Sequence, residues 1–425
     1  MKIETFDDYQ QSVYTQTLED GLKITLIPKK DFHSVFAALF VDAGAVDQQI
    51  VDEKGKKIIF PSGTAHFAEH KMFEKAEGDV SEIFSNYGAF SNAYTSQTQT
   101  VYYFQATEHI DDSIRLLLKF VQKPYYTQAS VDKEQGIIGQ ELAMYQDMPD
   151  WALSLGLMTN LYQNQPLSQD IGGQISTINQ LSPELLYCFH HYFYQPNKLH
   201  LKITGPIDPK KMSKLIQDTQ KELTRLPADF SRINLFDDRI PVIKQAVKTM
   251  PVSTPLLTAG IKGSKRLVDV TEAVILSFAS DLLLDLYFSD SSNWYMRNYN
   301  QGILDEDFSA QAEISRYYHF INFTGRGKDQ QLFEQIRLQL SRIMFDPKLE
   351  QEFEVQKQAT LGELSMSLDQ LENNILTTID SFDINVNVFR IIADLKTLTF
   401  KKAVDLFHDY YDIESFSVFS VKPSD

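Results

Sequence analysis

The chain has 425 residues, of which 43% are hydrophobic and 12% aromatic, so global disorder is excluded. A chain of this length is expected to form two domains of about 200 residues each. The net charge of −17 argues against a nucleic-acid surface, because phosphate backbones are bound by clustered Lys and Arg. This negative charge is compatible with attracting basic peptides. The alternative is that it only keeps the protein soluble.

Cysteine usage and apolar segments indicate the compartment. Cys188 is the one cysteine of the sequence, which excludes an intrachain disulfide framework and fits a reducing compartment. Residues 1–11 show neither an apolar signal core nor an Arg-rich amphipathic presequence. Residues 273–288 form the most apolar long segment, but they include two aspartates and are too few to span a bilayer. We therefore expect a cytoplasmic protein without membrane contact.

The first elements in chain order are two strands and a helix. Residues 22–28 and 35–41 are apolar, partly alternating runs separated by charged turn residues, which is typical of antiparallel strands. Residues 61–64 read Pro-Ser-Gly-Thr and predict a loop that ends in a helix N-cap. The helix that follows should carry the string at residues 66–70.

Residues 66–70 read His-Phe-Ala-Glu-His. His66 and His70, four positions apart on a helix, lie one above the other, so both imidazoles can reach one metal ion. Glu69 shares this face, and zinc in a catalytic site keeps one position open for water. A chance match or a structural pair of histidines is the alternative. The preceding loop and the apolar side of the helix favour a metal site.

The next elements are a helix at 80–87, strands around Asn92 and at 101–106, and an amphipathic helix at 109–122. Residues 91–95 read Ser-Asn-Ala-Tyr-Thr, and taken alone they favour an ordinary strand that enters a turn.

A long helix at 129–145 carries two carboxylates, Glu134 and Glu141. Seven residues are close to two helical turns, so both side chains point the same way. The spacing alone leaves two interpretations open, a solvated face or a third metal ligand. More helix, including 183–193, precedes a strand at 199–204.

Residues 223–242 are rich in charge, contain two prolines and predict a linker. We expect a catalytic zinc-binding domain at 1–222 and a similar domain without the metal motif at 243–425. Predicted strands of the second domain are 243–249, 256–261 and 415–421, and predicted helices are 270–287, 330–344 and most of 350–394. The fold class is α+β, with two related α/β-sandwich domains, each a mostly antiparallel sheet covered by helices.

Three strings in the first half resemble one known family. HFAEH, the later EQGIIGQE and the intervening SNAYTSQTQTVYYF are similar to the insulinase/pitrilysin zinc metallopeptidases, which include the mitochondrial processing peptidases. The resemblance continues through DMPDW, IGGQISTINQLS and YQPNKLHLKITGPID, and thus covers the N-terminal half. The C-terminal half matches only in general pattern. The resemblance implies a half-length chain of the processing-peptidase type.

The resemblance also implies the roles of the site residues. His66, His70 and Glu141 would bind one Zn²⁺ per chain. Glu69 would act as the general base, and Glu134 would orient the site without binding the metal. The implied reaction is peptide-bond hydrolysis without a covalent intermediate.

In the family a strand with an Asn-Ala-x-Thr sequence binds the substrate backbone as an added strand. The resemblance therefore implies substrate contacts at Asn92, Ala93 and Thr95. Family active sites also use an arginine and, seven residues later, a tyrosine from a C-terminal-type domain. Here Arg297 fits the arginine, but Leu304 stands at the tyrosine position.

This departure predicts a partner. Tyr299 or the cluster at 316–318 could take the place of the missing tyrosine, whose hydroxyl would stabilise the developing oxyanion. Family members enclose substrate in a clam-like chamber of two half-molecules, and this chain has the size of one half. We expect a heterodimer with a related subunit that supplies the Arg/Tyr pair, with a homodimer as the alternative.

The sequence thus predicts a zinc-dependent endopeptidase that hydrolyses peptides, or unfolded or leader segments, inside a chamber formed by two half-clamshell subunits. One alternative is a catalytically silent scaffold or chaperone-like subunit of a peptidase complex. Another is a zinc hydrolase of non-peptide substrates, which the peptide-pairing strand makes less favourable.

Overall fold

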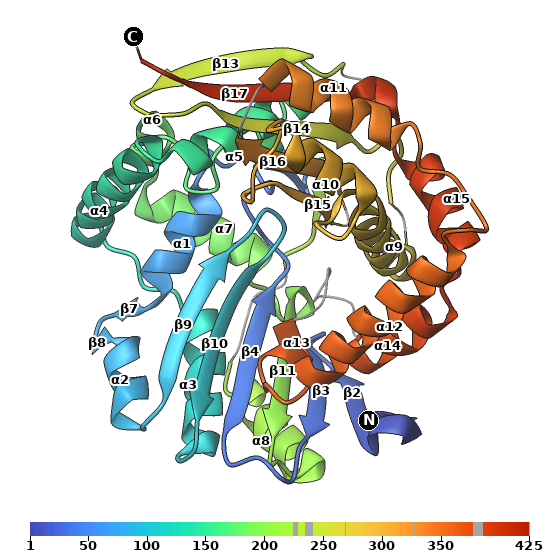
Figure 1. The fold of residues 1–425 in the computed structure, drawn as a ribbon. Coiled ribbons are helices and arrows are strands. Elements are labelled where there is room, and N and C mark those ends of the chain that lie inside the picture. The colour runs from blue at the N-terminus through green and yellow to red at the C-terminus, as the bar shows by residue number, and fades with distance from the viewer. Residues whose placement is uncertain are drawn as a thin grey trace. The chain divides into compact units, whose positions relative to one another are not determined.

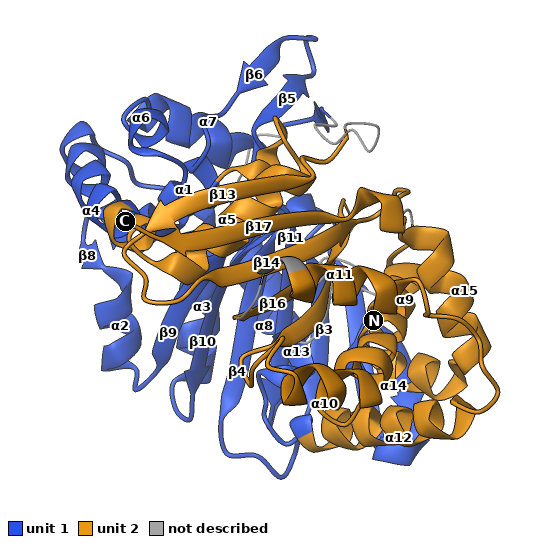
Figure 2. Cartoon of the chain, turned by 45° about the horizontal axis from the view of Figure 1, so that its top comes forward, with its two compact units in different colours: residues 1–142, 170–234, 367–388 blue, residues 143–169, 235–366, 389–425 orange. Residues whose placement is uncertain are grey.

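The computed structural model describes residues 1–223, 228–233, 241–267, 269–315, 317–326, 329–376 and 386–424. The chain forms two compact units, and each is described by itself (Figure 2). Unit 1 contains residues 1–142, 170–234 and 367–388, and unit 2 contains 143–169, 235–366 and 389–425. The units interleave along the chain, whereas the sequence predicts consecutive domains. The predicted linker at 223–242 remains a prediction, because 224–227 and 234–240 lie outside the described residues.

A seven-stranded sheet forms the centre of unit 1, with the strand order β1-β2-β3-β11-β4-β10-β9 (Figure 1). Its strands are β1 (Lys2–Phe6), β2 (Gln11–Thr17), β3 (Lys23–Pro28), β4 (Val35–Val41), β9 (Phe90–Thr95), β10 (Thr100–Ala106) and β11 (Leu199–Gly205). β3 and β11 are parallel, and all other neighbouring strands are antiparallel. The predicted, mostly antiparallel sheet is confirmed.

The central strand β4 is buried on both faces, which explains its unbroken apolar sequence. One face contributes Val35, Ala37, Leu39 and Val41 to the main core, under the helices. The opposite face contributes Phe36, Ala38 and Phe40 to a second cluster, which Leu371 and Ile375 cover. A segment from late in the sequence therefore completes unit 1.

Helices of unit 1 are α1 (Thr64–Met72), α2 (Val80–Asn86), α3 (Ile110–Gln122), α4 (Gln128–Gln146, up to residue 142), α6 (Ile175–Ile178), α7 (Pro183–Phe193), α8 (Pro209–Lys221) and α13 (Asn373–Leu376). α1 packs on β9 and β10, α3 on β10 and β4, and α8 on β3. A small sheet joins β5 (Gln49–Asp52), β6 (Lys57–Ile59) and β12 (Phe230–Arg232), and β7 (Glu74–Lys75) pairs with β8 (Gly78–Asp79).

Unit 2 has a five-stranded sheet with the order β13-β17-β14-β16-β15. Its strands are β13 (Gln245–Met250), β14 (Leu256–Lys262), β15 (Ser309–Ile314), β16 (His319–Arg326) and β17 (Ser417–Pro423). Its helices are α5 (Pro149–Leu161), α9 (Val270–Phe288), α10 (Asn293–Asn300), α11 (Asp329–Leu340), α12 (Glu350–Ser367), α14 (Val388–Thr397) and α15 (Phe400–Tyr410). α5 packs on β13, β14 and β17, and α9 packs on β15 and α15.

The two sheets repeat one topology. β3-β11-β4-β10-β9 in unit 1 and β13-β17-β14-β16-β15 in unit 2 each begin with a parallel pair and continue with antiparallel neighbours. The prediction of two similar domains is thereby confirmed. The prediction of helix over most of 350–394 is confirmed by α12, α13 and α14, although turns separate α12, which ends at Ser367, from α13. Residues 377–385 of that prediction lie outside the described residues.

Among the helices that the structure describes, none combines the length and the apolar character needed to cross a membrane.

Candidate metal centre

The position of the two histidines of α1 is fixed by the cap at the start of the helix and by its buried apolar residues. Gly63 caps its start with a φ of +91°, a conformation that favours glycine, and the Thr64 hydroxyl donates to the Pro61 carbonyl at 2.6 Å. Phe67 and Ala68 pack in the main core of unit 1. This anchoring leaves His66 and His70 side by side, with ring centroids 4.5 Å apart.

Helix α4 brings the carboxylates to α1. Val131, Ile138 and Leu142 bury one side of α4 in the same core. Glu134 and Glu141 lie next to this apolar side, so both carboxylates reach the histidines. The oxygen Oε2 of Glu141 lies 3.9 Å from Nε2 of His70.

Ligand atoms of His66, His70 and Glu141 all lie within 4.8 Å of one another. Among the residues that the structure describes, this is the one group of three or more His, Cys, Asp or Glu side chains with such geometry. Ligands of a tetrahedral zinc lie about 3.3–3.6 Å apart, given zinc–ligand distances of about 2.0–2.2 Å. Two imidazoles and a carboxylate are one of the donor sets found in catalytic zinc sites, so these residues fit the ion after small side-chain adjustments.

Glu134 contacts the outer side of His70. The Nδ1 atom of His70 donates to Oε1 of Glu134 at 3.1 Å, which leaves Nε2 directed to Glu141. Burial acts to lower the pKa of His70, but the bond to Glu134 and the charges of Glu69 and Glu134 together raise it. A metal-binding imidazole commonly donates its other N–H to such a carboxylate. Glu134 is thus placed to orient a ligand.

Glu69 lies on α1 with its carboxylate beside β9. Its Oε2 accepts a hydrogen bond from Oγ1 of Thr95 at 3.3 Å. Burial raises the pKa of Glu69 to about 7, against the opposing effects of His70 and of the Thr95 hydrogen bond. The carboxylate is therefore held in place next to the ligands and is able to gain and lose a proton near neutral pH.

His66 is more enclosed than His70. Burial, and then the charge of His70, lowers the pKa of His66 to about 4, so its ring is neutral at neutral pH. Neutral imidazole is the form that binds metal ions. The Nδ1 atom of His66 is buried without a hydrogen-bond partner among the described residues, and a Cβ on Gly172 would lie 3.6 Å from it.

Gly172 and Gly173 of the IGGQ segment pack closely against the start of α1. The sequence did not predict this role. A Cβ at Gly63 would lie 2.4 Å from the Gly172 carbonyl oxygen, and a Cβ at Gly173 would lie 2.4 Å from that of Ser62. Gly173 also has a φ of +80°. Only glycines allow these two backbone segments to approach so closely.

The predicted substrate strand is β9, the last strand of its sheet. Asn92 and Ala93 lie opposite Tyr103 and Tyr102 of β10. The Asn92 carboxamide oxygen accepts from the Ala93 N–H at 2.8 Å. Thr95, also a predicted substrate contact, uses its hydroxyl to contact Glu69. The roles of these three residues toward a substrate remain predictions.

The predicted arginine and tyrosine positions lie in unit 2. Arg297 is an exposed residue of α10, and its role remains a prediction. Leu304 is 4% exposed, so this position belongs to the apolar interior of unit 2. Tyr299 is exposed on α10, whereas Arg316 of the alternative cluster lies outside the described residues.

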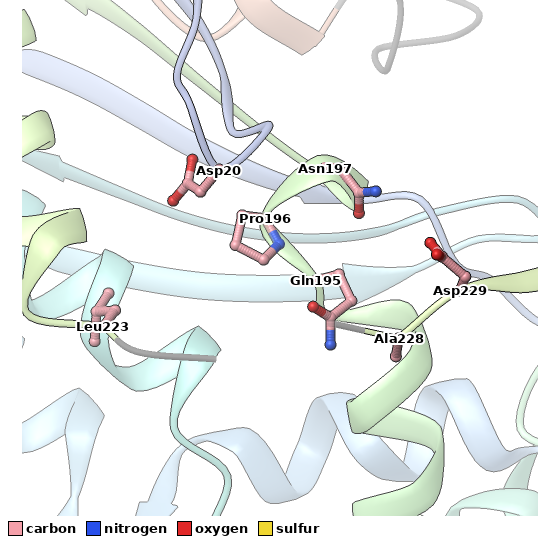
Figure 3. Close-up of a pocket in the computed structure, with 7 residues that line it drawn as sticks. All are labelled: Asp20, Gln195, Pro196, Asn197, Leu223, Ala228 and Asp229. Carbon is pink, nitrogen blue, oxygen red and sulfur yellow. The ribbon is translucent and has the colours of Figure 1, made fainter. Parts of the chain in front are cut away.

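Unit 1 also contains a hollow of about 240 Å³ (Figure 3). Its lining residues are Asp20, Gln195, Pro196, Asn197, Leu223, Ala228 and Asp229. Asp20 accepts from the backbone N–H of Leu22, and Gln195 donates to the His191 carbonyl, so both side chains hold local turns. None of the lining residues belongs to the metal cluster.

Comparison with known proteins identifies the family of the chain. The model of the insulinase family, peptidase family M16, matches residues 25–174, and that of the peptidase M16 inactive domain matches residues 180–359. The Bacillus subtilis protein YmfH, described as an uncharacterized zinc protease, is 34% identical over 341 residues, 79% of each chain. The chain therefore belongs to the insulinase family of peptidases, M16. His66, Glu69, His70, Glu134 and Glu141 all lie in the stretch that the insulinase model matches.

Two further comparisons describe the type of family member. A solved M16-like peptidase from Alicyclobacillus acidocaldarius has a TM-score of 0.90 and 29% identity, covering 97% of this chain and 99% of that one. The mitochondrial-processing peptidase subunit beta of Saccharomyces cerevisiae is 27% identical over 233 residues, 54% of this chain and 48% of that protein. The chain is of the half-length type that was predicted.

Proposed function

We propose that this chain is a zinc-dependent endopeptidase. The observation that carries the proposal is the convergence of His66, His70 and Glu141, from α1 and α4, to within 4.8 Å of one another. Glu69 lies on the same helix as the histidines, where a general base is required. The description of YmfH as a zinc protease supports the choice of metal.

Each residue of the site has a task in hydrolysis. Zinc, when bound, supplies positive charge that acidifies a water and polarises the peptide carbonyl. Glu69, held by the Thr95 hydroxyl, accepts a proton from the water and passes it to the leaving nitrogen. The water oxygen bonds to the peptide carbon first, the C–N bond then breaks as the nitrogen takes up the proton, and no covalent bond forms between enzyme and substrate. Glu134 keeps His70 in its orientation throughout.

The substrate in this proposal is an extended peptide that adds to the edge of β9. Main-chain hydrogen bonds at a sheet edge supply affinity, and alternate side-chain pockets supply selectivity. The Ala93 N–H donates its hydrogen bond to the Asn92 carboxamide oxygen. A carbonyl oxygen of the incoming peptide could accept this bond in place of the carboxamide oxygen. Peptides, or unfolded or leader segments, meet this requirement, and the net charge of −17 favours basic ones.

The proposal includes a second subunit. Buried Leu304 offers no hydroxyl where a family member supplies tyrosine, so a related subunit would complete the site with its Arg/Tyr pair. Two half-clamshell subunits would then form the reaction chamber. One relative is itself described as subunit beta of a processing peptidase. A homodimer is the alternative. We also propose a cytoplasmic location, which the single cysteine supports.

A catalytically silent scaffold or chaperone-like subunit is the second candidate function. Leu304 favours it, as does the match of residues 180–359 to a model named for an inactive domain. The two candidates differ in one measurable property, which is peptide turnover when zinc and a partner are present.

Two matched substitutions test the protease proposal. Glu69→Gln removes the base but no ligand, so it should retain zinc and lose turnover by about 100-fold to 10,000-fold. Glu141→Gln should instead weaken zinc retention. Glu82→Gln, at an exposed position of α2, is the control and should change neither property. Metal content and cleavage of a basic peptide library are measured for each.

The outcomes separate the candidates. Identical behaviour of Glu69→Gln and Glu141→Gln would show that the roles are assigned wrongly. Zinc without turnover in the unmodified protein, even with a partner supplied, would establish the scaffold.

A further inference from the structure

Lys71 directly follows the second histidine, and its side chain is only 1% exposed. Lysine is almost never buried to this extent unless its charge is paired. Its ammonium donates to Oε2 of Glu74 and lies 3.7 Å from Oε2 of Glu134. The charge is thus shared by two carboxylates, of which one contacts the metal cluster.

The two carboxylates differ in their access to water. The side chain of Glu74 is 42% exposed, so water can solvate it when the lysine is absent. The side chain of Glu134 is 12% exposed and depends on partners within the protein. Removal of the ammonium should therefore affect Glu134 more than Glu74.

Glu134 has a different partner on each oxygen. Its Oε1 accepts from Nδ1 of His70 at 3.1 Å, and its Oε2 faces the Lys71 ammonium. A carboxylate with one partner can rotate about its last bond, whereas partners on both oxygens fix its plane. The plane of Glu134 in turn fixes the ring of His70, whose Nε2 is directed to Glu141.

We propose that Lys71 is a positioning residue of the metal centre, acting through Glu134 on His70. Its ammonium pairs with Glu74 and Glu134, neither of which is one of the three proposed ligands. The inference rests on the proposed function for the identity of the metal. It adds the Lys71 ammonium as a third group behind the His70 imidazole and the Glu134 carboxylate. Groups in the surroundings of a metal ligand commonly change metal affinity by about 10-fold to 100-fold.

Zinc affinity, measured by competition with a chelator on the full chain, tests this directly. Lys71→Met keeps the length and removes the charge, and it should weaken zinc binding about tenfold. Glu74→Gln removes the other ion pair of the same lysine and should leave the affinity within about twofold. Circular dichroism and thermal unfolding of the metal-free variants show whether each one folds.

A double-mutant cycle identifies the route of the effect. Because Lys71 acts through Glu134, Lys71→Met should change zinc affinity little further in a Glu134→Gln background. The spectrum of bound cobalt, which reports ligand geometry, should change in Lys71→Met and stay unchanged in Glu74→Gln. A merely structural lysine would lower the unfolding temperature without altering that spectrum.

Two results would overturn the inference. One is wild-type zinc affinity in Lys71→Met. The other is a loss of zinc affinity from Lys71→Met that is equally large with Glu134 present and in the Glu134→Gln background. Neither depends on peptide cleavage. A chain that binds zinc but hydrolyses no peptide would contradict the protease proposal and leave the Lys71 result standing.

Discussion

His319 is a buried histidine that ties the stability of unit 2 to pH. It begins β16, is 3% exposed, and its Nε2 donates to the Tyr410 carbonyl at 3.2 Å. Burial lowers the pKa of His319 to about 4, although the bond to Tyr410 opposes this change. In the unfolded chain a histidine titrates near pH 6.5. Between these values the unfolded chain binds a proton that the folded chain does not, so stability falls as the pH falls.

We expect this one group to reduce the free energy of unfolding by about 2 kcal/mol between pH 7.5 and pH 5. His319→Gln should show a correspondingly weaker dependence over that range, measured by urea unfolding at both values. His33→Gln, at an exposed position of unit 1, is the control and should keep the wild-type dependence. Equal slopes for wild type and His319→Gln would contradict this assignment.

For single residues, the sequence predicts the site residues whose relative position follows from the helix pitch. It does not predict roles that depend on how two helices pack together. His66, Glu69 and His70 follow from local spacing. The choice of Glu141 over Glu134 as ligand does not, because both point the same way from α4 and only the docking of that helix on α1 distinguishes them. Lys71 was missed because a lysine on a helix is normally solvated, and its burial depends on distant Glu134.

At the element scale, close helix–sheet packing in unit 2 depends on one small residue. Gly156 lies in α5, and a Cβ there would lie 2.4 Å from the Phe419 ring of β17. That ring is itself enclosed by buried Leu153 and Met250, so it has little room to move. Gly362, within α12, has open space at the corresponding point.

Two glycine-to-alanine substitutions should therefore have opposite effects. Gly156→Ala should destabilise unit 2 by roughly 1–3 kcal/mol through overpacking. Gly362→Ala should stabilise it by about 0.5–1 kcal/mol, because alanine favours a helix. Thermal unfolding of both variants checks this. An unfolding temperature that rises with Gly156→Ala would show that the ring yields freely.

The elements that the sequence predicts best are those with strong apolar patterns. β4, α3 and α9 carry such patterns and lie where predicted. β15 reads Ser-Ala-Gln-Ala-Glu-Ile and was not predicted, because a half-exposed strand at a sheet edge has little apolar alternation. Its position is determined by pairing with β16, which is a tertiary property.

At the scale of the whole molecule, the sequence shows the repeat but not its interleaving. The order of strands predicts two similar domains, and both sheets confirm it. The crossing of residues 367–388 into unit 1 was not predicted, because it depends on Leu371 and Ile375 packing against Phe36 and Phe40. Contacts between segments so distant in sequence leave no periodic signal.

The partner is the main prediction at this scale. Because Leu304 provides no hydroxyl, we expect the purified chain alone to cleave peptides slowly and a mixture with a related Tyr-bearing subunit to cleave about 100-fold faster, the effect of one oxyanion donor. Titration of candidate paralogues against a fixed amount of this chain checks this. Full activity of the isolated homodimer would contradict it.

In the proposed function, side chains from α1 and α4 together hold one zinc ion. X-ray diffraction at the zinc absorption edge, from crystals of the unmodified protein grown with zinc, tests it most directly. We expect a single anomalous peak per chain, bonded to His66, His70 and Glu141 at about 2.0–2.2 Å, with Glu69 beside it and unbonded. A peak elsewhere, or no peak with these three side chains unliganded, would show that His66, His70 and Glu141 do not bind zinc.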